Sequence, residues 1–96
     1  MSFRRAAKKD GNQTEIVEAL RALGYDVDIV HQLKNLYDLV ITGTRRGESV
    51  AVRVEVKMPG GRLTPGELEY WQKQRHPDNL IIAESVEDVL RWFEAA

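Results

Sequence analysis

The sequence predicts an α/β fold, with helices and strands in the order α-β-β-β-α-β-α around a central mixed sheet. Three observations predict it: apolar residues at helical spacing after helix-start signals, stretches that alternate apolar and polar residues, and a short apolar run before the last helix. Three strands in an antiparallel meander and a fourth reached through a helical crossover would make the sheet. The 96 residues suffice for one small domain. It is expected over residues 12–96, after a basic lead-in at residues 1–11.

The first helix is expected to begin at Asn12, because Asn-Gln-Thr-Glu places Glu15 three residues after a preferred N-cap residue. This spacing is typical of a capping box, in which the cap and glutamate side chains bond each other's backbone N–H groups. Gly24 lies where a helix-ending glycine is common. The apolar positions at helical spacing are Ile16, Ala19, Leu20 and Leu23. They predict an amphipathic helix with one buried face.

The second helix carries three agreeing start signals, with Thr64 as the N-cap, Pro65 at the first helical position and Glu67 at the third. Its expected inward positions are Leu68, Trp71 and Gln72. Ser85 is expected to cap the last helix. The apolar stripe of that helix comprises Val86, Val89, Leu90 and Phe93.

The predicted strands are YDVDIV, LYDLVITG, SVAVRVEVK and LIIA. The third alternates strictly, so its side chains divide between two faces. One face would carry valines, and the other would carry Ala51, Arg53, Glu55 and Lys57. The segment TRRGES indicates a polar turn between the second and third strands. LIIA lacks alternation and suits a buried strand.

Composition limits the possible sites and locations. The absence of cysteine excludes disulfides, thiolate metal sites and cysteine nucleophiles. No apolar run approaches the roughly 20 residues of a membrane span, and the N-terminal residues lack the apolar stretch of a signal peptide. The cytoplasm is therefore the expected location. The net charge of −1 divides into +3 over residues 1–12, −3 over 13–43, +3 over 44–75 and −4 over 76–96. This segregation fits basic strips beside an acidic pocket, and it also fits chance.

Asp38, Glu55 and Lys57 form the clearest candidate site. Alternation points Glu55 and Lys57 the same way, and pairing of the second and third strands would bring Asp38 beside them. Two carboxylates there would make an all-oxygen site, which suits Mg²⁺ or Mn²⁺ rather than zinc. The lysine could position an attacking water or stabilise charge on a phosphate. A half-exposed strand also alternates valine with charged residues without any catalytic role, and this alternative stays open.

The order of these features resembles the PD-(D/E)XK nuclease superfamily. The resemblance lies in the leading helix, Asp38 in LYDLVI, Glu55-Val56-Lys57 on the next strand, and the glycine break and helix that follow. More narrowly, KKDGNQTEIVEALRALG, VEVKMPGGRLTPGE and SVEDVL are similar to the small VRR-NUC and Holliday-junction-resolvase-like nucleases of phages and prophages. The similarity covers nearly the whole chain from Lys9 onward. It implies a restriction-endonuclease-like fold and a Mg²⁺- or Mn²⁺-dependent DNA endonuclease that leaves 5′-phosphates, with branched or flap DNA as its substrate.

The resemblance also implies a role for each matching residue. Asp38, Glu55 and the backbone carbonyl of Val56 would bind the metal. Lys57 would serve the attacking water or the transition-state phosphate. Glu15 would be an accessory acid that reaches the metal directly or through water.

At three further positions the chain leaves an alternative open or departs from the family pattern. Gln13 matches the first-helix pattern of the family, but equally fits a helix residue without a catalytic part. Tyr37 stands where the family usually has proline, and Glu67 stands where it commonly has glutamine. Because both glutamine and glutamate complete a capping box, Glu67 is expected to be a cap rather than a site residue.

Several other side chains are candidates for contacts outside the carboxylate site. The arginines that could contact DNA phosphates, and that equally fit solvated surface charges, are Arg53, Arg62, Arg45 and Arg46. The two histidines, His31 and His76, are expected to be solvated. The two tryptophans, Trp71 and Trp92, are expected to be core or interface aromatics.

A homodimer is expected, because one domain of this size offers little surface for gripping two DNA arms. The expected partner is DNA, with no membrane and no small-molecule cofactor. One alternative is a non-catalytic subunit that binds nucleic acid or assists assembly with the same fold. Another is a protein-interaction module whose acidic last helix docks a basic partner. The first would bind DNA without cutting it, and the second would not bind DNA.

Overall fold

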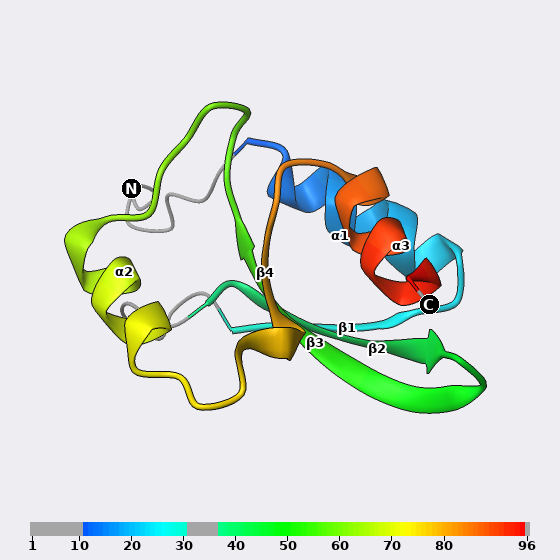
Figure 1. Cartoon of the computed structure of the whole chain (residues 1–96). Coiled ribbons are helices and arrows are strands. Elements are labelled where there is room, and N and C mark those ends of the chain that lie inside the picture. The colour runs from blue at the N-terminus through cyan, green and yellow to red at the C-terminus, as the bar shows by residue number, and fades with distance from the viewer. Residues whose placement is uncertain (1–10, 31–36, 96) are drawn as a thin grey trace.

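The chain folds as α/β with a four-stranded mixed sheet and three helices (Figure 1). The computed structural model describes residues 11–30 and 37–95, so the predicted lead-in lies outside the described residues except for Gly11. The strands are β1 Asp26–Ile29, β2 Leu39–Arg45, β3 Glu48–Val56 and β4 Leu80–Ala83. The helices are α1 Gln13–Ala22, α2 Pro65–Gln72 and α3 Val86–Glu94, with a short 3₁₀ helix at Pro77–Asn79. This order confirms the predicted α-β-β-β-α-β-α sequence of elements.

The sheet has the strand order β1-β2-β3-β4. The first three strands pair antiparallel, and β4 pairs parallel to β3. A parallel neighbour requires a crossover connection, and here the crossover contains α2. The predicted meander and crossover are therefore both present.

The hairpin between β2 and β3 is tighter than the sequence indicated. Arg45 pairs with Glu48, so only Arg46 and Gly47 form the loop. Both have positive φ, at 55° and 82°, which is the combination that a two-residue type I′ turn requires. This turn matches the twist of the strands, and pairing therefore continues into residues that were expected to lie in the turn.

One face of the sheet is covered by α1 and α3, which lie together in Figure 1, while α2 lies apart from them. The core between these layers consists of buried apolar side chains: Ile16, Val17, Leu20, Val27, Leu39, Ile41, Val52, Val54, Val56, Ala83, Val89 and Phe93. The predicted stripe of α3 is confirmed, because Val86 and Leu90 also pack against this core. Removal of these side chains from water is the main force that holds the layers together.

Four predicted inward positions are wrong or only partly right. Leu23 is 61% exposed because α1 ends at Ala22, before that position completes the stripe. Leu68 is 45% exposed and Gln72 is exposed too, and no residue of α2 is buried. Ile82 is 39% exposed because it pairs with Glu55 and therefore lies on the face of the sheet away from α1 and α3.

Helix α1 begins after Asn12 as expected, but its predicted capping box does not form. Asn12 has φ −89° and ψ −3°, a helical conformation, and its side chain makes no capping hydrogen bond. Its amide nitrogen instead donates to the carbonyl oxygens of Lys57, at 3.1 Å, and Glu84, at 2.8 Å. These long-range partners tie the start of α1 to the ends of β3 and β4.

Candidate active site

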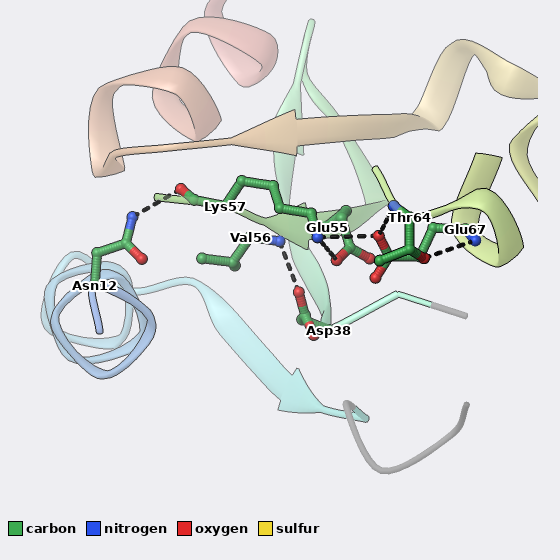
Figure 2. A network of polar contacts seen from close by, with 7 residues as sticks. All are labelled: Asn12, Asp38, Glu55, Val56, Lys57, Thr64 and Glu67. Carbon is green, nitrogen blue, oxygen red and sulfur yellow. Dashed lines mark hydrogen bonds and ion pairs between the residues drawn. The ribbon is translucent and has the colours of Figure 1, made fainter. Parts of the chain in front are cut away.

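The candidate site lies on the face of β3 opposite to the valines of the core. Val52, Val54 and Val56 are buried beneath the helices. The residues between them and after them, Arg53, Glu55 and Lys57, therefore project from the other face, toward α2. Figure 2 shows Asp38, Glu55, Lys57 and Glu67 gathered at this end of the sheet.

Asp38 is held beside Glu55 by the strand register. Leu39 pairs with Val54, so the residue before Leu39 lies next to the residue after Val54. The backbone N–H of Asp38 donates to the carbonyl of Val54 at 2.9 Å. Its Oδ2 accepts the backbone N–H of Val56 at 2.7 Å (Figure 2). The aspartate is thus fixed through both its backbone and its side chain.

Glu55 is a buried carboxylate, with only 4% of the residue exposed. Burial raises the pKa of Glu55 from 4.5 to about 8, and the negative charges of Asp38 and Glu67 and a side-chain hydrogen bond with Glu67 act in the same direction. The nearby ammonium of Lys57 opposes this shift without cancelling it. At neutral pH and without a cation, Glu55 is therefore largely protonated.

Lys57 lies between two carboxylates. Its Nζ is 2.9 Å from Oε1 of Glu67 and 3.5 Å from Oε2 of Glu55, and 14% of its side chain is exposed. Burial alone would lower the pKa of Lys57, but the hydrogen bond and charge of Glu67, together with Glu55, raise it above its usual value. Lys57 is therefore a charged donor at the edge of the acidic group.

Glu67 belongs to both the helix cap and the site. The predicted capping box is present, because the Thr64 side chain accepts the N–H of Glu67 and the Glu67 side chain accepts the N–H of Thr64. Burial alone would raise the pKa of Glu67, but the Thr64 N–H and the Lys57 ammonium lower it below its usual value. Capping was correctly predicted for this residue, and its direct contact with Lys57 was missed.

The glycine-rich segment after Lys57 brings Glu67 back to the strand. The N–H of Gly61 donates to the carbonyl of Met58 at 2.8 Å, and Gly60 has φ 85°. A residue with a Cβ is strained at such an angle, whereas glycine is not. The chain therefore turns directly after β3 and reaches the capped start of α2 within a few residues.

Glu15 is not brought to these carboxylates. It is exposed and borders a groove of about 320 Å³ between the starts of α1 and α3, with Asn12, Glu84 and Ser85 among its neighbours. The charges that act on Glu55 are those of Asp38, Glu67 and Lys57. The buried polar residue of α1 is Gln13, at 1% exposed.

Helical spacing explains why Gln13 rather than Glu15 points inward. Gln13, Ile16, Val17 and Leu20 are buried and stand at positions i, i+3, i+4 and i+7. Gln13 also borders a groove with Ile29, whose strand partner is Leu39. The apolar pattern already contained this signal, because extending it back by three residues from Ile16 reaches Gln13.

Arg53 is engaged within the protein. Its guanidinium donates to Oε1 of Gln74 at 2.7 Å, to Oδ1 of Asn79 at 2.8 Å and to the carbonyl of His76 at 2.9 Å. A longer contact of 3.4 Å reaches the hydroxyl of Tyr70. These bonds fasten the end of α2 and the following turn to β3, so the guanidinium is already used by the fold.

The remaining arginines differ in position. Arg45 lies over the ring of Trp92, 4.2 Å from its centroid, and Arg46 is exposed in the hairpin loop. Arg45 is seven residues from Asp38 along β2, or about 24 Å at the usual rise of a strand. Arg62 is exposed in the segment that leads to α2, at the same end of the sheet as the carboxylates.

The predicted aromatic and histidine positions are partly described. Trp92 is half-buried and donates from Nε1 to the carbonyl of Asp78 at 3.0 Å. Trp71 is also half-buried, and the side chain of His76 is exposed. His31 lies outside the described residues.

The donor set suits a hard divalent cation better than a softer one. Asp38, Glu55 and Glu67 supply three carboxyl groups against the single ammonium of Lys57, so full ionisation leaves an excess of negative charge. Within residues 11–30 and 37–95, no three histidine or acidic side chains form a group that could hold a metal by themselves. Mg²⁺ commonly uses one or two carboxylates and keeps several waters, so Asp38 and Glu55 fit that cation.

The comparisons with known proteins give no relative. No protein-family model, curated protein or solved structure matches the chain. In the described part of the chain, no helix has the length and apolar character needed to cross a membrane.

Proposed function

We propose that this protein is a divalent-metal-dependent DNA endonuclease with a restriction-endonuclease-like fold. The observation that carries the proposal is the buried carboxyl of Glu55, with Asp38 beside it directly before the neighbouring strand β2 and the Nζ of Lys57 at 3.5 Å. Burial of a carboxyl group beside other carboxylates costs stability. A site that binds a cation and a phosphate would explain why the chain places these carboxyl groups together despite that loss of stability. A solvated strand face would not explain it.

In this proposal Asp38 and Glu55 would hold Mg²⁺ or Mn²⁺, together with the backbone carbonyl of Val56. The bound cation would lower the pKa of a water and neutralise charge on the phosphate. The Val56 N–H keeps the Asp38 carboxylate oriented, since it donates to Oδ2 at 2.7 Å. Burial opposes the loss of the Glu55 proton, and a cation bound in place of that proton would favour its loss.

Lys57 would stabilise the charge that develops on the phosphate oxygens during attack. The water oxygen forms a bond to phosphorus, the bond to the 3′-oxygen breaks, and the leaving oxygen takes up a proton. The products would be a 5′-phosphate and a 3′-hydroxyl. An ammonium fixed beforehand beside the reacting phosphate contributes more than a mobile one, because no reorganisation is needed during the reaction.

The proposed substrate is DNA, with branched or flap structures as the first class to test. Arg62 is exposed at the end of the sheet that carries the carboxylates, so it is the arginine best placed to meet the same stretch of DNA. Arg45 and Arg46 would contact a segment about 24 Å away along β2. A homodimer would supply a second site for the other strand.

The test uses purified protein with junction, flap and duplex DNA in Mg²⁺ or Mn²⁺. Asp38→Asn keeps an oxygen for the Val56 N–H, and Lys57→Met keeps most of the side-chain volume. Each should lower the cleavage rate by about 100-fold or more. The matched controls are Asp28→Asn, an exposed carboxylate on β1, and Lys73→Met, an exposed lysine after α2. Both should cut at the parental rate.

The proposal fails if folded Asp38→Asn and Lys57→Met proteins cut as fast as the parent. DNA binding without cleavage in any divalent ion would favour the non-catalytic nucleic-acid-binding subunit. Such binding should weaken steeply as salt is raised. No binding to any DNA would favour the protein-interaction module.

A further inference from the structure

One oxygen atom of Glu67 links the start of α2 to the candidate site. Oε1 accepts the backbone N–H of Thr64 at 2.8 Å and the Nζ of Lys57 at 2.9 Å. The N–H of Glu67 in turn donates to the Thr64 hydroxyl at 3.2 Å. The Glu67 side chain is therefore held by the helix cap and also contacts Lys57, as Figure 2 shows.

Lys57 depends on such an anchor. A lysine side chain has four rotatable carbon bonds and loses considerable freedom when its ammonium is held in one place. Its contact with Glu55 is longer, 3.5 Å against 2.9 Å to Glu67.

We infer that Glu67 is a positioning residue, which holds the ammonium of Lys57 beside Glu55 in the orientation needed for phosphate. This inference rests on the proposed nuclease function. A cation bound by Asp38 and Glu55 would occupy the Glu55 carboxylate, and Glu67 would then be the anionic anchor that remains for Lys57. Glu67 itself contacts no reacting atom in this arrangement.

The ion pair with Lys57 also explains how the negatively charged Glu67 can lie in a site that would receive phosphate. An uncompensated glutamate would repel a phosphodiester. Glu67 is compensated, because it shares its charge with Lys57 at 2.9 Å and with a backbone N–H at the positive end of α2. Glutamate is therefore compatible with this position as long as Lys57 is present.

Glu67→Gln separates positioning from capping. Glutamine keeps the shape and an oxygen for the Thr64 N–H, so the capping box can still form, but it removes the charge that anchors Lys57. The matched control is Glu69→Gln, which removes the same charge from the same helix. Glu69 pairs with Lys73 on the surface, where 67% and 73% of the two side chains are exposed.

The first readout is the Lys57 ammonium signal in ¹H–¹⁵N NMR spectra of the metal-free protein, assigned by its loss in Lys57→Met. Hydrogen bonding slows proton exchange and makes such a signal visible. We expect the signal in the parent and in Glu69→Gln, and its loss by exchange broadening in Glu67→Gln. This readout needs neither metal nor DNA.

The second readout is steady-state cleavage of the best DNA substrate in Mg²⁺. Glu67→Gln should lower kcat at least about 10-fold with little change in KM, because misplacement of a catalytic group acts on the transition state. Glu69→Gln should leave kcat near the parental value.

The two readouts distinguish a failure of the inference about Glu67 from a failure of the proposed nuclease function. If the parent cuts DNA and Glu67→Gln cuts equally fast or faster, Glu67 does not position Lys57 and the inference is wrong. If the parent cuts no DNA in any divalent ion, the proposed function is wrong and the role of Glu67 in it falls as well. The ammonium signal then still reports whether the ion pair exists in solution.

Discussion

The two faces of β3 and of Lys57, which directly follows it, alternate along one stretch of chain but depend on different interactions. The valine face is buried under α1 and α3, where any apolar side chain of similar volume would serve. The face with Arg53, Glu55 and Lys57 is held by hydrogen bonds and ion pairs to named partners. Alternation therefore defines which side chains share a face, whereas the role of each face depends on what the rest of the chain brings to it.

The largest effect is expected on the valine face. Val54→Ala should lower the free energy of unfolding by about 2–3 kcal/mol, because it removes buried methyl groups and leaves a cavity. Ala51→Ser, at an exposed position on the other face of the same strand, should change it by less than about 0.5 kcal/mol. Urea denaturation of both variants measures the difference. Equal losses would show that the two faces are not distinguished by burial.

Glu55 should make the stability of the metal-free protein fall with rising pH. Its pKa is about 8 in the fold against an ordinary value of 4.5, so between these values the folded state keeps a proton that the unfolded chain has released. Stability is then fully present below about 4.5 and is lost as pH rises to about 8. The loss should be at least about 1.4 kcal/mol, the equivalent of one pKa unit.

Glu55→Gln isolates this contribution, because glutamine has no carboxyl proton to lose. Urea denaturation in a chelator at a series of pH values should show a flatter profile for the variant than for the parent. The difference between the two profiles is the relevant measure, since other groups titrate equally in both proteins. Parallel profiles would contradict a buried protonated Glu55.

Substitutions of Arg53 and Arg62 should have different effects, the first on the stability of the fold and the second on DNA binding. Arg53→Lys should cost about 1 kcal/mol of stability, because lysine cannot reproduce the forked contacts to Gln74 and Asn79. Arg62→Ala should leave stability unchanged and reduce the salt dependence of DNA binding by about one phosphate contact. Filter binding at several salt concentrations and urea denaturation test both. A loss of DNA affinity without a loss of stability in Arg53→Lys would reverse this assignment.

Local signals in the sequence predicted those features that depend on near neighbours. Thr64 and Glu67 are three residues apart and form the capping box that their identities indicate. Asn12 and Glu15 carry the same signal, yet the Asn12 amide bonds two distant carbonyls instead. The difference lies in tertiary partners, which a short pattern does not contain.

The part of the candidate site that depends on strand register could be predicted from the sequence. Pairing across one hairpin and period-two alternation suffice to bring Asp38, Glu55 and Lys57 together. The contact between Lys57 and Glu67 depends on the path of the chain through the Met58–Gly61 turn, which composition alone does not define. Glu15 was wrongly expected at the site. It lies in the expected helix, but on the side that faces away from Asp38 and Glu55.

The side-chain amide of Asn12 has a consequence for the kinetics of folding. It joins carbonyl groups that are 45 and 72 residues away along the chain. Contacts across such separations form only after long loops have closed. This pair of bonds is therefore expected to be absent from the folding nucleus and to form late. Interactions of that kind slow unfolding more than they speed folding, so a single asparagine at the start of the first helix helps to set the lifetime of the folded state.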